Sequence, residues 1–283
     1  MDIITSVSEM QQRAISARAA GQTISFVPTM GFLHQGHVSL LEEGRKRGDL
    51  LVLSIFVNPT QFGQGEDFSD YPRDLQQDSD LAQAADVDIL FAPAAVEMYS
   101  PGYATYVDVD GISENLCGAS RPGHFRGVCT VVSKLFNIVQ PHFAIFGNKD
   151  FQQLAVIKRM TLDMNMLVEV VGLPIFREAD GLAMSSRNVY LTPEQRKQAL
   201  VLSQSLTLAK ELVAAGQTNC ADIILQLKNT ISKQPEARID YVQICHQLTL
   251  VNQAHVDADS VLLLAVYIGK TRLIDNSFLL ADR

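Results

Sequence analysis

Short apolar runs alternate with segments of helical periodicity through the first two thirds of the chain. The apolar runs predict buried strands at 24–27, 50–57, 88–91, 142–146 and 167–171. The segments between them predict helices at 36–47, 74–85, 127–139 and 151–164. Such alternation is typical of a parallel sheet that helices cover on both faces. We therefore predict an α/β fold with a Rossmann-like, doubly wound parallel sheet.

The pattern changes after Pro174. Thr192 and Pro193 form a helix start, with an N-cap and a first-turn proline, and we expect one long helix from there to about Ala214. A further helix is expected at 221–231, and β-rich runs follow at 239–245, 261–268 and 271–276. These elements predict two domains, residues 1–175 with the parallel sheet and residues 176–283 as a smaller C-terminal α+β lid domain.

Composition and charge exclude several classes of protein. Of the 283 residues 47% are hydrophobic, which is enough for a large core and excludes intrinsic disorder. Lys and Arg total 23 against 31 Asp and Glu, so the net charge of −8 argues against a nucleic-acid surface but permits a local basic pocket. The longest apolar run, 261–268, is too short to span a membrane.

The chain start and the cysteines indicate a cytoplasmic protein. The first residues lack a basic segment followed by an apolar one, so no secretory signal is expected. The four cysteines contain no Cys-x-x-Cys pair and are few for a chain of this length. We expect reduced thiols.

The first group of candidate residues lies between a predicted strand and helix, in Pro28-Thr29-Met30-Gly31-Phe32-Leu33-His34-Gln35-Gly36-His37. His34 and His37 are three apart, so their imidazoles share one side of a helical turn. Gly31 and Gly36 let backbone approach a ligand, and the helix start adds free N–H groups and a positive dipole end. The run predicts a polyphosphate site whose imidazoles can donate to a leaving phosphate. A metal pair or a helix cap without function is the alternative.

The second group, Gly147-Asn148-Lys149-Asp150, follows the strand expected at 142–146. Lys149 offers a compact charge to a phosphate, and Asp150 can accept from ribose hydroxyls. An exposed turn is the alternative. The position at the carboxyl end of a strand favours a function, because ligands of doubly wound sheets bind there.

The third group, Met184-Ser185-Ser186-Arg187-Asn188, follows a flexible Asp-Gly pair. Two hydroxyls and a guanidinium in succession suit an anion clamp on a mobile loop. A solvated turn is the alternative.

The fourth group follows the strand expected at 50–57. Asn58 and Gln61 are uncharged hydrogen-bonding side chains beside aromatic surface, and they suit a small polar organic acid. Gln153 could face the same cleft, although a surface position is the default for it and for its neighbour Gln152. A turn stabilised by the Asn-Pro pair is the alternative for Asn58.

Other polar residues carry weaker signals. Asp78 is expected on a solvated helix face. The basic run from Arg121 through His124 to Arg126 either guards the cleft or forms a surface turn, which we favour. The chain contains no P-loop and no nucleophile elbow, so a P-loop nucleotidase or a hydrolase triad is not expected.

Taken in order, these motifs resemble the pantoate–β-alanine ligase (pantothenate synthetase) family of the His-x-Gly-His nucleotidyltransferase superfamily. The resemblance runs from about Phe26 to Leu191 and rests on the segments 28–37, 56–62, 71–73, 124–128, 147–153 and 181–188. The last third of the chain fits the family in length and element order without sharp motifs.

The resemblance implies a reaction in two steps. Pantoate attacks the α-phosphorus of Mg-ATP to give pantoyl adenylate and pyrophosphate, and the amine of β-alanine then displaces AMP to give pantothenate. It implies Mg²⁺ as cofactor, brought by ATP and not by a protein metal site, and small-molecule partners with neither nucleic acid nor membrane. It also implies a homodimer formed through the first domain.

The resemblance also implies the site residues. Catalytic roles fall to His34, His37, Lys149 and Arg187, with His37 as the general acid. Pantoate and β-alanine are expected at Asn58, Gln61 and Gln153. Contacts to ATP are expected from Met30, Gly31, Phe32, Leu33, His34, Gln35, Gly36, His37, Gly147, Lys149, Asp150, Phe176, Met184, Ser185, Ser186 and Arg187.

Two positions depart from the family pattern. Asn148 stands where the family usually has Glu, which removes a charge beside Lys149, and Ser100 stands where it usually has Pro. The alternative function is a nucleotidyltransferase of the same superfamily that acts on a phosphorylated small molecule, and a catalytically silent nucleotide-binding module is a third possibility.

Overall fold

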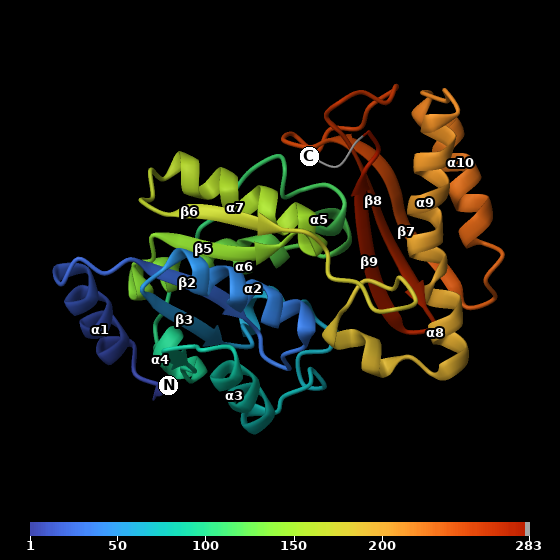
Figure 1. The fold of residues 1–283 in the computed structure, drawn as a ribbon. Helices are drawn as coiled ribbons and strands as arrows, with labels where there is room; N and C mark the ends of the chain where they lie inside the picture. Colours follow the sequence, from blue (N-terminus) through green and yellow to red (C-terminus); the bar gives the residue numbers. More distant parts are fainter. Residues whose placement is uncertain (281–283) are drawn as a thin grey trace.

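A six-stranded parallel sheet takes up the first two thirds of the chain in the computed structural model, which describes residues 1–280 (Figure 1). The strand order is β1-β4-β3-β2-β5-β6. Neighbouring strands pair in parallel throughout. The strands are β1 (Asp2–Ile4), β2 (Ile24–Thr29), β3 (Leu50–Ile55), β4 (Ile89–Phe91), β5 (Phe143–Gly147) and β6 (Glu169–Leu173).

Helices cover both faces of this sheet, as the apolar strands predict. One face packs against α2 (Gln35–Arg47) and α3 (Leu75–Ala84). The other packs against α1 (Val7–Ala19), α6 (His124–Val139) and α7 (Phe151–Asp163) (Figure 1). Neighbouring residues of β2 join different cores, Phe26 beneath α1 and α6 and Val27 beneath α2, because successive strand side chains point to opposite faces.

Shorter helices form the connections. They are α4 (Ala95–Met98), α5 (Cys117–Ser120) and the 3₁₀ helices η1 (Pro59–Gln61), η2 (Asn148–Asp150) and η3 (Ser186–Tyr190).

The strand order reverses between β2 and β5. From β2 the chain continues to β3 on one side, and from β5 it continues to β6 on the other. The loops that leave the carboxyl ends of β2 and β5 therefore diverge, and such a switch point is where ligands bind in doubly wound sheets. Residues 30–34 and 148–150 form these two loops.

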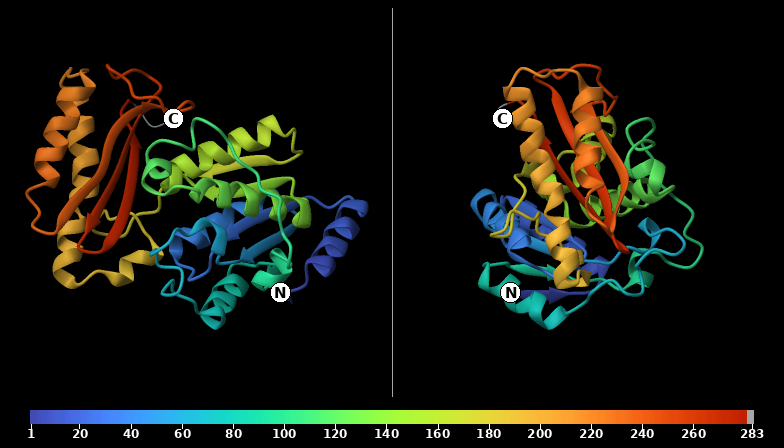
Figure 2. Two further views of the ribbon diagram at one scale, coloured as in Figure 1. Left: turned by 180° about the vertical axis from the view of Figure 1, so that it is seen from behind. Right: turned by 90° about the vertical axis from the view of Figure 1, so that its right-hand side faces the viewer.

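A three-stranded antiparallel sheet in the order β7-β8-β9 forms the second part of the molecule. The long helices α9 (Val201–Ala214) and α10 (Cys220–Ile231) pack against one face of the sheet (Figure 2). The opposite face meets α5 and α7 through an apolar cluster that includes Leu116, Phe151 and Leu263. The elements are α8 (Pro193–Ala199), α9 (Val201–Ala214), α10 (Cys220–Ile231), β7 (Ala237–His246), β8 (Ser260–Ile268) and β9 (Thr271–Phe278).

The predicted fold class is confirmed, with local differences. The single long helix expected after Thr192 is two helices that meet at Leu200, since the chain turns there to keep both helices against the antiparallel sheet. β1 and α1 were not foreseen, because a three-residue edge strand and a polar helix leave weak periodicity. The domain boundary expected at 175/176 lies between β6 and α8 and stays a prediction. No helix within residues 1–280 is long and apolar enough to cross a membrane.

Candidate functional site

A pocket of about 220 Å³ lies at the carboxyl ends of β2 and β5, beside the switch point. It shares lining residues with a larger cleft of about 1070 Å³ between the two sheets. Twelve of the residues expected to contact ATP line the smaller pocket: Met30, His34, Gly36, His37, Gly147, Lys149, Asp150, Phe176, Met184, Ser185, Ser186 and Arg187. The four segments singled out in the sequence therefore converge, because Asn58, Gln61 and Gln153 line the same pocket.

Four of the expected ATP contacts lie outside this lining. Leu33 is buried in the core beneath α2 and Gln35 is exposed, whereas Gly31 and Phe32 shape the loop that carries them. Gly31 (φ +82°) and Phe32 (φ +51°) are both left-handed, a conformation that glycine adopts freely and phenylalanine rarely does. The run therefore lines the pocket with residues 28–30 and with His34, Gly36 and His37.

Asp78 of α3 fixes this loop. Its carboxylate accepts hydrogen bonds from the backbone N–H groups of Phe32 (2.8 Å) and Leu33 (2.6 Å), and the residue is only 1% exposed. The expectation that Asp78 lies on a solvated helix face is wrong. Its partners are 46 and 45 residues away, so helical periodicity alone could not reveal them. The left-handed turn is thus held in place by the protein's own carboxylate.

His34 and His37 stack at the start of α2, with ring centroids 4.0 Å apart. The backbone N–H of His34 donates to Nδ1 of His37 (3.3 Å), so a neutral His37 ring carries its proton on Nε2. Burial, with His34 and Lys149 nearby, lowers the pKa of His37 to about 3. Burial and Lys149 lower the pKa of His34 to about 4. Both rings are neutral near pH 7, and the buried Nδ1 of His34 has no hydrogen-bond partner within the described residues.

Lys149 lies in η2, directly after β5. A residue from the second part of the molecule supports this turn: Asn276 of β9 donates from Nδ2 to the carbonyls of Asn148 and Lys149, at 2.9 Å each. Asn276 was not foreseen from the sequence, because it is 127 residues from Lys149 and lies in a segment without a sharp motif. The lysine turn thus depends on both sheets.

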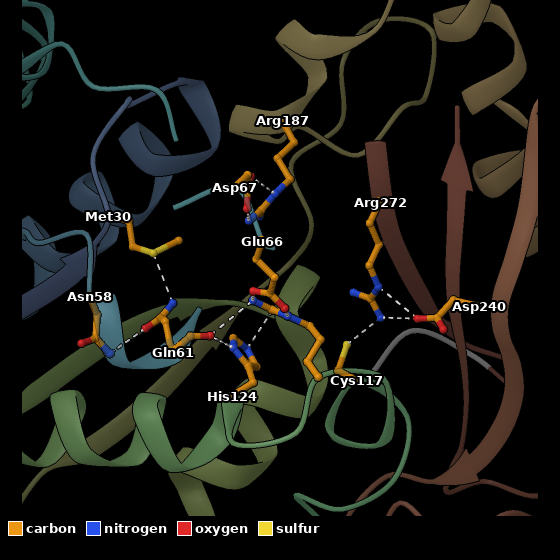
Figure 3. Close-up of polar contacts among 11 residues, drawn as sticks. Met30, Asn58, Gln61, Glu66, Asp67, Cys117, His124, Arg187, Asp240 and Arg272 are labelled. Atoms are coloured by element: carbon orange, nitrogen blue, oxygen red, sulfur yellow. Dashed lines mark hydrogen bonds and ion pairs between the residues drawn. The ribbon is translucent and has the colours of Figure 1, made fainter. Parts of the chain in front are cut away.

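The loop that carries Arg187 contacts the histidine run. Ser186 donates to the carbonyl of Phe32 (3.3 Å), and the backbone N–H of Gly36 lies 3.4 Å from Sδ of Met184. Arg187 forms two hydrogen bonds with Asp67, from Nε (2.9 Å) and Nη2 (3.0 Å) (Figure 3). No motif pointed to Asp67, which is 120 residues away in the chain.

Uncharged groups form the opposite side of the pocket. Asn58 caps the start of η1 and Gln61 is its last residue. Gly127 lets α6 approach this helix, since a Cβ there would meet the carbonyl of Thr60 at 2.4 Å. The Asn58 side chain is almost fully buried and bonded within the protein. Four apolar side chains of α6 complete this side: Val128, Val131, Val132 and Leu135.

Two further sequence expectations need correction. His124 is buried at the start of α6, and not on a surface turn: Arg121 donates to its Nε2 (3.1 Å), so its Nδ1–H donates to the carbonyl of Gln61 (2.8 Å) (Figure 3). Arg121 in turn pairs with Glu66 (2.7 Å), and burial and Arg121 lower the pKa of His124 to about 4. Gln152 is buried as well, because its amide binds backbone groups that include Cys117 N and Ile112 O.

Comparisons with known proteins give independent information on the family of this chain. A family model described as Pantoate-beta-alanine ligase matches residues 2–278. The pantothenate synthetase of Syntrophotalea carbinolica is 58% identical over 282 residues and that of Geotalea uraniireducens 56%, each covering 100% of both chains.

Solved structures are similar too. The crystal structure of pantothenate synthetase from Thermus thermophilus has a TM-score of 0.93 at 46% identity and covers 99% of both chains. A pantoate-beta-alanine ligase from Francisella tularensis, complexed with beta-gamma ATP and beta-alanine, has a TM-score of 0.81 at 34% identity, with 100% of this chain and 99% of that chain covered.

Proposed function

The chain belongs to the pantoate–β-alanine ligase family, and from this premise we propose which of its residues carry each step of the reaction. The enzyme condenses (R)-pantoate with β-alanine and consumes ATP, giving pantothenate, AMP and pyrophosphate through a pantoyl adenylate. The main support for the residue assignments is that one pocket is lined by both imidazoles, by Lys149 and Arg187, and by the amide of Gln61.

In the first step a carboxylate oxygen of pantoate bonds to the α-phosphorus, and the bond from that phosphorus to the pyrophosphate oxygen breaks. Negative charge grows on the departing phosphates, where Lys149, Arg187 and Ser185 can stabilise it. The Nε2–H of His37 donates a hydrogen bond there. Action as a general acid further requires that the phosphate charge raise the pKa of the imidazole and that Nδ1 give up its contact with the His34 N–H, which can only donate. His34 supports the same charge from the adjacent ring.

Pantoate is proposed to lie against the uncharged side of the pocket. The valines of α6 suit its two methyl groups, and the amides of Gln61 and Gln153 bind its oxygens. Neutral amides suit a carboxylate that must act as a nucleophile, because a cation paired with it would lower its reactivity. The alternative substrate, a phosphorylated small molecule, is disfavoured because the family that matches residues 2–278 is that of pantoate-beta-alanine ligase.

In the second step the β-alanine nitrogen bonds to the acyl carbon, loses a proton, and displaces AMP with its bridging oxygen. The 1070 Å³ cleft gives the amine a path to the acyl carbon, because it shares Gln153 with the smaller pocket. Asn58 was expected near the amine. Its amide is instead committed to internal hydrogen bonds, which supports a positioning role.

Mg²⁺ is proposed to accompany the triphosphate. Asp150 is the one carboxylate among the described residues that line the smaller pocket. No group of three or more His, Cys, Asp or Glu side chains in residues 1–280 could hold a metal ion. Such a donor set fits an ion that the triphosphate brings and that phosphate oxygens and water hold, which leaves Asp150 for the ribose hydroxyls. The bound ion would offset phosphate charge.

A homodimer and a cytoplasmic location also belong to the proposal. Leu162 at the end of α7 is exposed, as are Met164 and Leu167 in the connection to the edge strand β6. We propose that a second copy covers these apolar side chains. All four cysteines are buried free thiols, as suits a reducing compartment. Sedimentation tests the dimer: the natural chain should have the mass of two copies, and Leu167→Glu should shift it towards the mass of one.

An oxygen-labelling experiment tests the proposed chemistry. Pantoate carrying ¹⁸O in its carboxylate is turned over with ATP and β-alanine, and the AMP is analysed by mass spectrometry. One labelled oxygen per AMP is expected, because the bridging oxygen stays with phosphorus in the second step. Unlabelled AMP, or AMP formed equally without pantoate, would refute the adenylate route.

A further inference from the structure

The amide of Asn58 has only one possible orientation, and this orientation begins a chain of hydrogen bonds that ends in the substrate pocket. The backbone N–H of Thr60 points at Oδ1 of Asn58 (3.4 Å), and Nδ2 points at the carbonyl of Gly127 (3.1 Å). A backbone N–H only donates and a backbone carbonyl only accepts. The oxygen and nitrogen of the Asn58 amide therefore cannot exchange places.

The orientation of Asn58 determines that of Gln61. Nδ2 of Asn58 donates to Oε1 of Gln61 (3.1 Å), so the NH₂ group of Gln61 turns to the other side (Figure 3). There it meets Sδ of Met30 at 3.2 Å, and both residues line the 220 Å³ pocket. A thioether is a weak acceptor. Gln61 thus presents a donor to the pocket that an anionic oxygen would satisfy better.

A tyrosine outside the pocket holds this arrangement. Tyr99, at the end of α4, donates from its hydroxyl to Oδ1 of Asn58 at 2.7 Å. This is the shortest of the contacts to that oxygen, the others being Thr60 Oγ1 (3.0 Å) and Thr60 N (3.4 Å). The tyrosine ring is itself fixed between Phe56, at a centroid distance of 6.2 Å, and Tyr103, at 5.0 Å.

The Tyr99 hydroxyl remains a donor over the working pH range, because burial raises its pKa to about 12. Tyr99 is not among the residues that line the smaller pocket, so any effect on substrate must pass through Asn58 and Gln61.

We propose that Tyr99 is a positioning residue for pantoate, which acts through Asn58 to keep the NH₂ group of Gln61 facing an oxygen of the substrate. The inference rests on the proposed role of Gln61 and adds the reason for its orientation. Without the tyrosine hydroxyl, Asn58 loses its shortest restraint. The contacts to Thr60 N–H and to the Gly127 carbonyl still fix which way round the Asn58 amide lies, but the amide is held less firmly. Its Nδ2 therefore restrains Oε1 of Gln61 less, and Gln61 more often turns its carbonyl oxygen towards the anionic substrate, which repels it.

Tyr99→Phe tests the proposal, because it removes the hydroxyl and keeps the ring. We expect the KM for pantoate to rise by about 5- to 10-fold, the effect of about one hydrogen bond, while kcat and the KM for ATP stay within about 2-fold. Tyr103→Phe is the matched control, and it should leave the KM for pantoate unchanged. Melting curves of both variants show whether the fold is kept.

Asn58→Asp provides a second measurement that does not depend on Tyr99→Phe folding. A carboxylate at position 58 can only accept at neutral pH, so the NH₂ group of Gln61 turns towards it and its oxygen faces the pocket. The KM for pantoate should rise by about 10- to 100-fold, again without a matching change in the KM for ATP.

The outcomes separate this inference from the proposed function. An active natural chain whose KM for pantoate is unchanged in Tyr99→Phe, or moves equally in Tyr103→Phe, overturns the inference alone. Equal losses for ATP and pantoate in either Tyr99→Phe or Asn58→Asp overturn it too, since they indicate general damage. A natural chain that releases no AMP in response to pantoate would instead overturn the proposed function.

Discussion

The two sides of the pocket are built differently. On the uncharged side, Asn58 and Gln61 lie in one short segment, and their hydrogen bonds end on neighbouring groups of the parallel-sheet part. The other side, which is proposed to bind phosphate and is called the phosphate side below, is formed by Lys149 and Arg187 from separate loops. One is supported by Asn276 of the antiparallel sheet, and the other is paired with Asp67.

The difference follows from charge. Neutral amides can be buried at little cost once they are hydrogen-bonded, so their side of the pocket can be complete before any substrate arrives. Uncompensated buried cations are costly, and the partly buried Arg187 is therefore covered by a carboxylate that a polyphosphate must replace. We infer that the pantoate side is pre-organised, whereas the phosphate side is completed on binding.

The largest effect is expected from His37→Ala, which removes the donor proposed to serve the departing phosphates. Pyrophosphate release in the first step should slow by about 10²- to 10⁴-fold, the range for a general acid combined with charge stabilisation. Rapid-quench measurements at saturating ATP and pantoate give this rate. His255→Ala, an exposed histidine of the second part, is the control and should keep the natural rate. A His37→Ala variant with nearly natural turnover would show that the phosphate side does not need this imidazole.

Gln61→Ala examines the opposite side. Loss of an amide that binds a charged oxygen should raise the KM for pantoate by about 10- to 100-fold. The KM for ATP should stay within about 2-fold, because the two sides are proposed to act separately. Initial rates with each substrate varied in turn supply the measurement, and equal increases in both constants would remove the distinction between the two sides.

The sequence was informative where residues that act together are also close in the chain. Five of the six parallel strands and the pair His34 and His37 follow from periodicity and from spacing within one turn, whereas β1 and the strand order do not. Lys149 was found because its short motif follows a predicted strand, where the sheet-edge rule predicts a ligand site. Arg187 was found from the succession of two hydroxyls and a guanidinium after a turn, and both residues line the same pocket.

The supporting residues could not be found in this way. Asp78, His124 and Asp67 bind groups that are 46, 63 and 120 residues away. An aspartate at the start of a polar helix has the same local pattern whether it faces water or a backbone turn. Their roles depend on tertiary packing, to which one-dimensional periodicity is insensitive. For the same reason the internal hydrogen bonds of Asn58 were not foreseen, and its expected contact with substrate stays a prediction.

Asn276→Leu tests the dependence of the lysine turn on the antiparallel sheet. The substitution removes the hydrogen bonds from Asn276 to the carbonyls of Asn148 and Lys149, so the turn that positions the Lys149 ammonium is held less firmly. We expect kcat to fall by about 10-fold with the KM for pantoate nearly unchanged, because a misplaced charge weakens the transition state more than it weakens pantoate binding. Ser277→Ala, the next residue of β9, is the control. A drop in pantoate affinity as large as the drop in kcat would contradict the separation of the two sides.

The smallest effect concerns stability and pH. Burial keeps the pKa values of His34 and His37 well below 6.5, so between about pH 6.5 and pH 4 the unfolded chain binds protons that the folded chain does not. Stability should therefore fall as the pH drops through this window and level off above it. Between pH 7.5 and pH 5 the free energy of unfolding of His37→Asn should fall by about 1–2 kcal/mol less than that of the natural chain, as measured by urea unfolding at both pH values. Gln35→Ala, in the same helix but without a titrating group, should follow the natural chain. If the stability of His37→Asn fell with pH as much as that of the natural chain, burial would not hold the His37 imidazole neutral. His37 would then be positively charged before any nucleotide arrives.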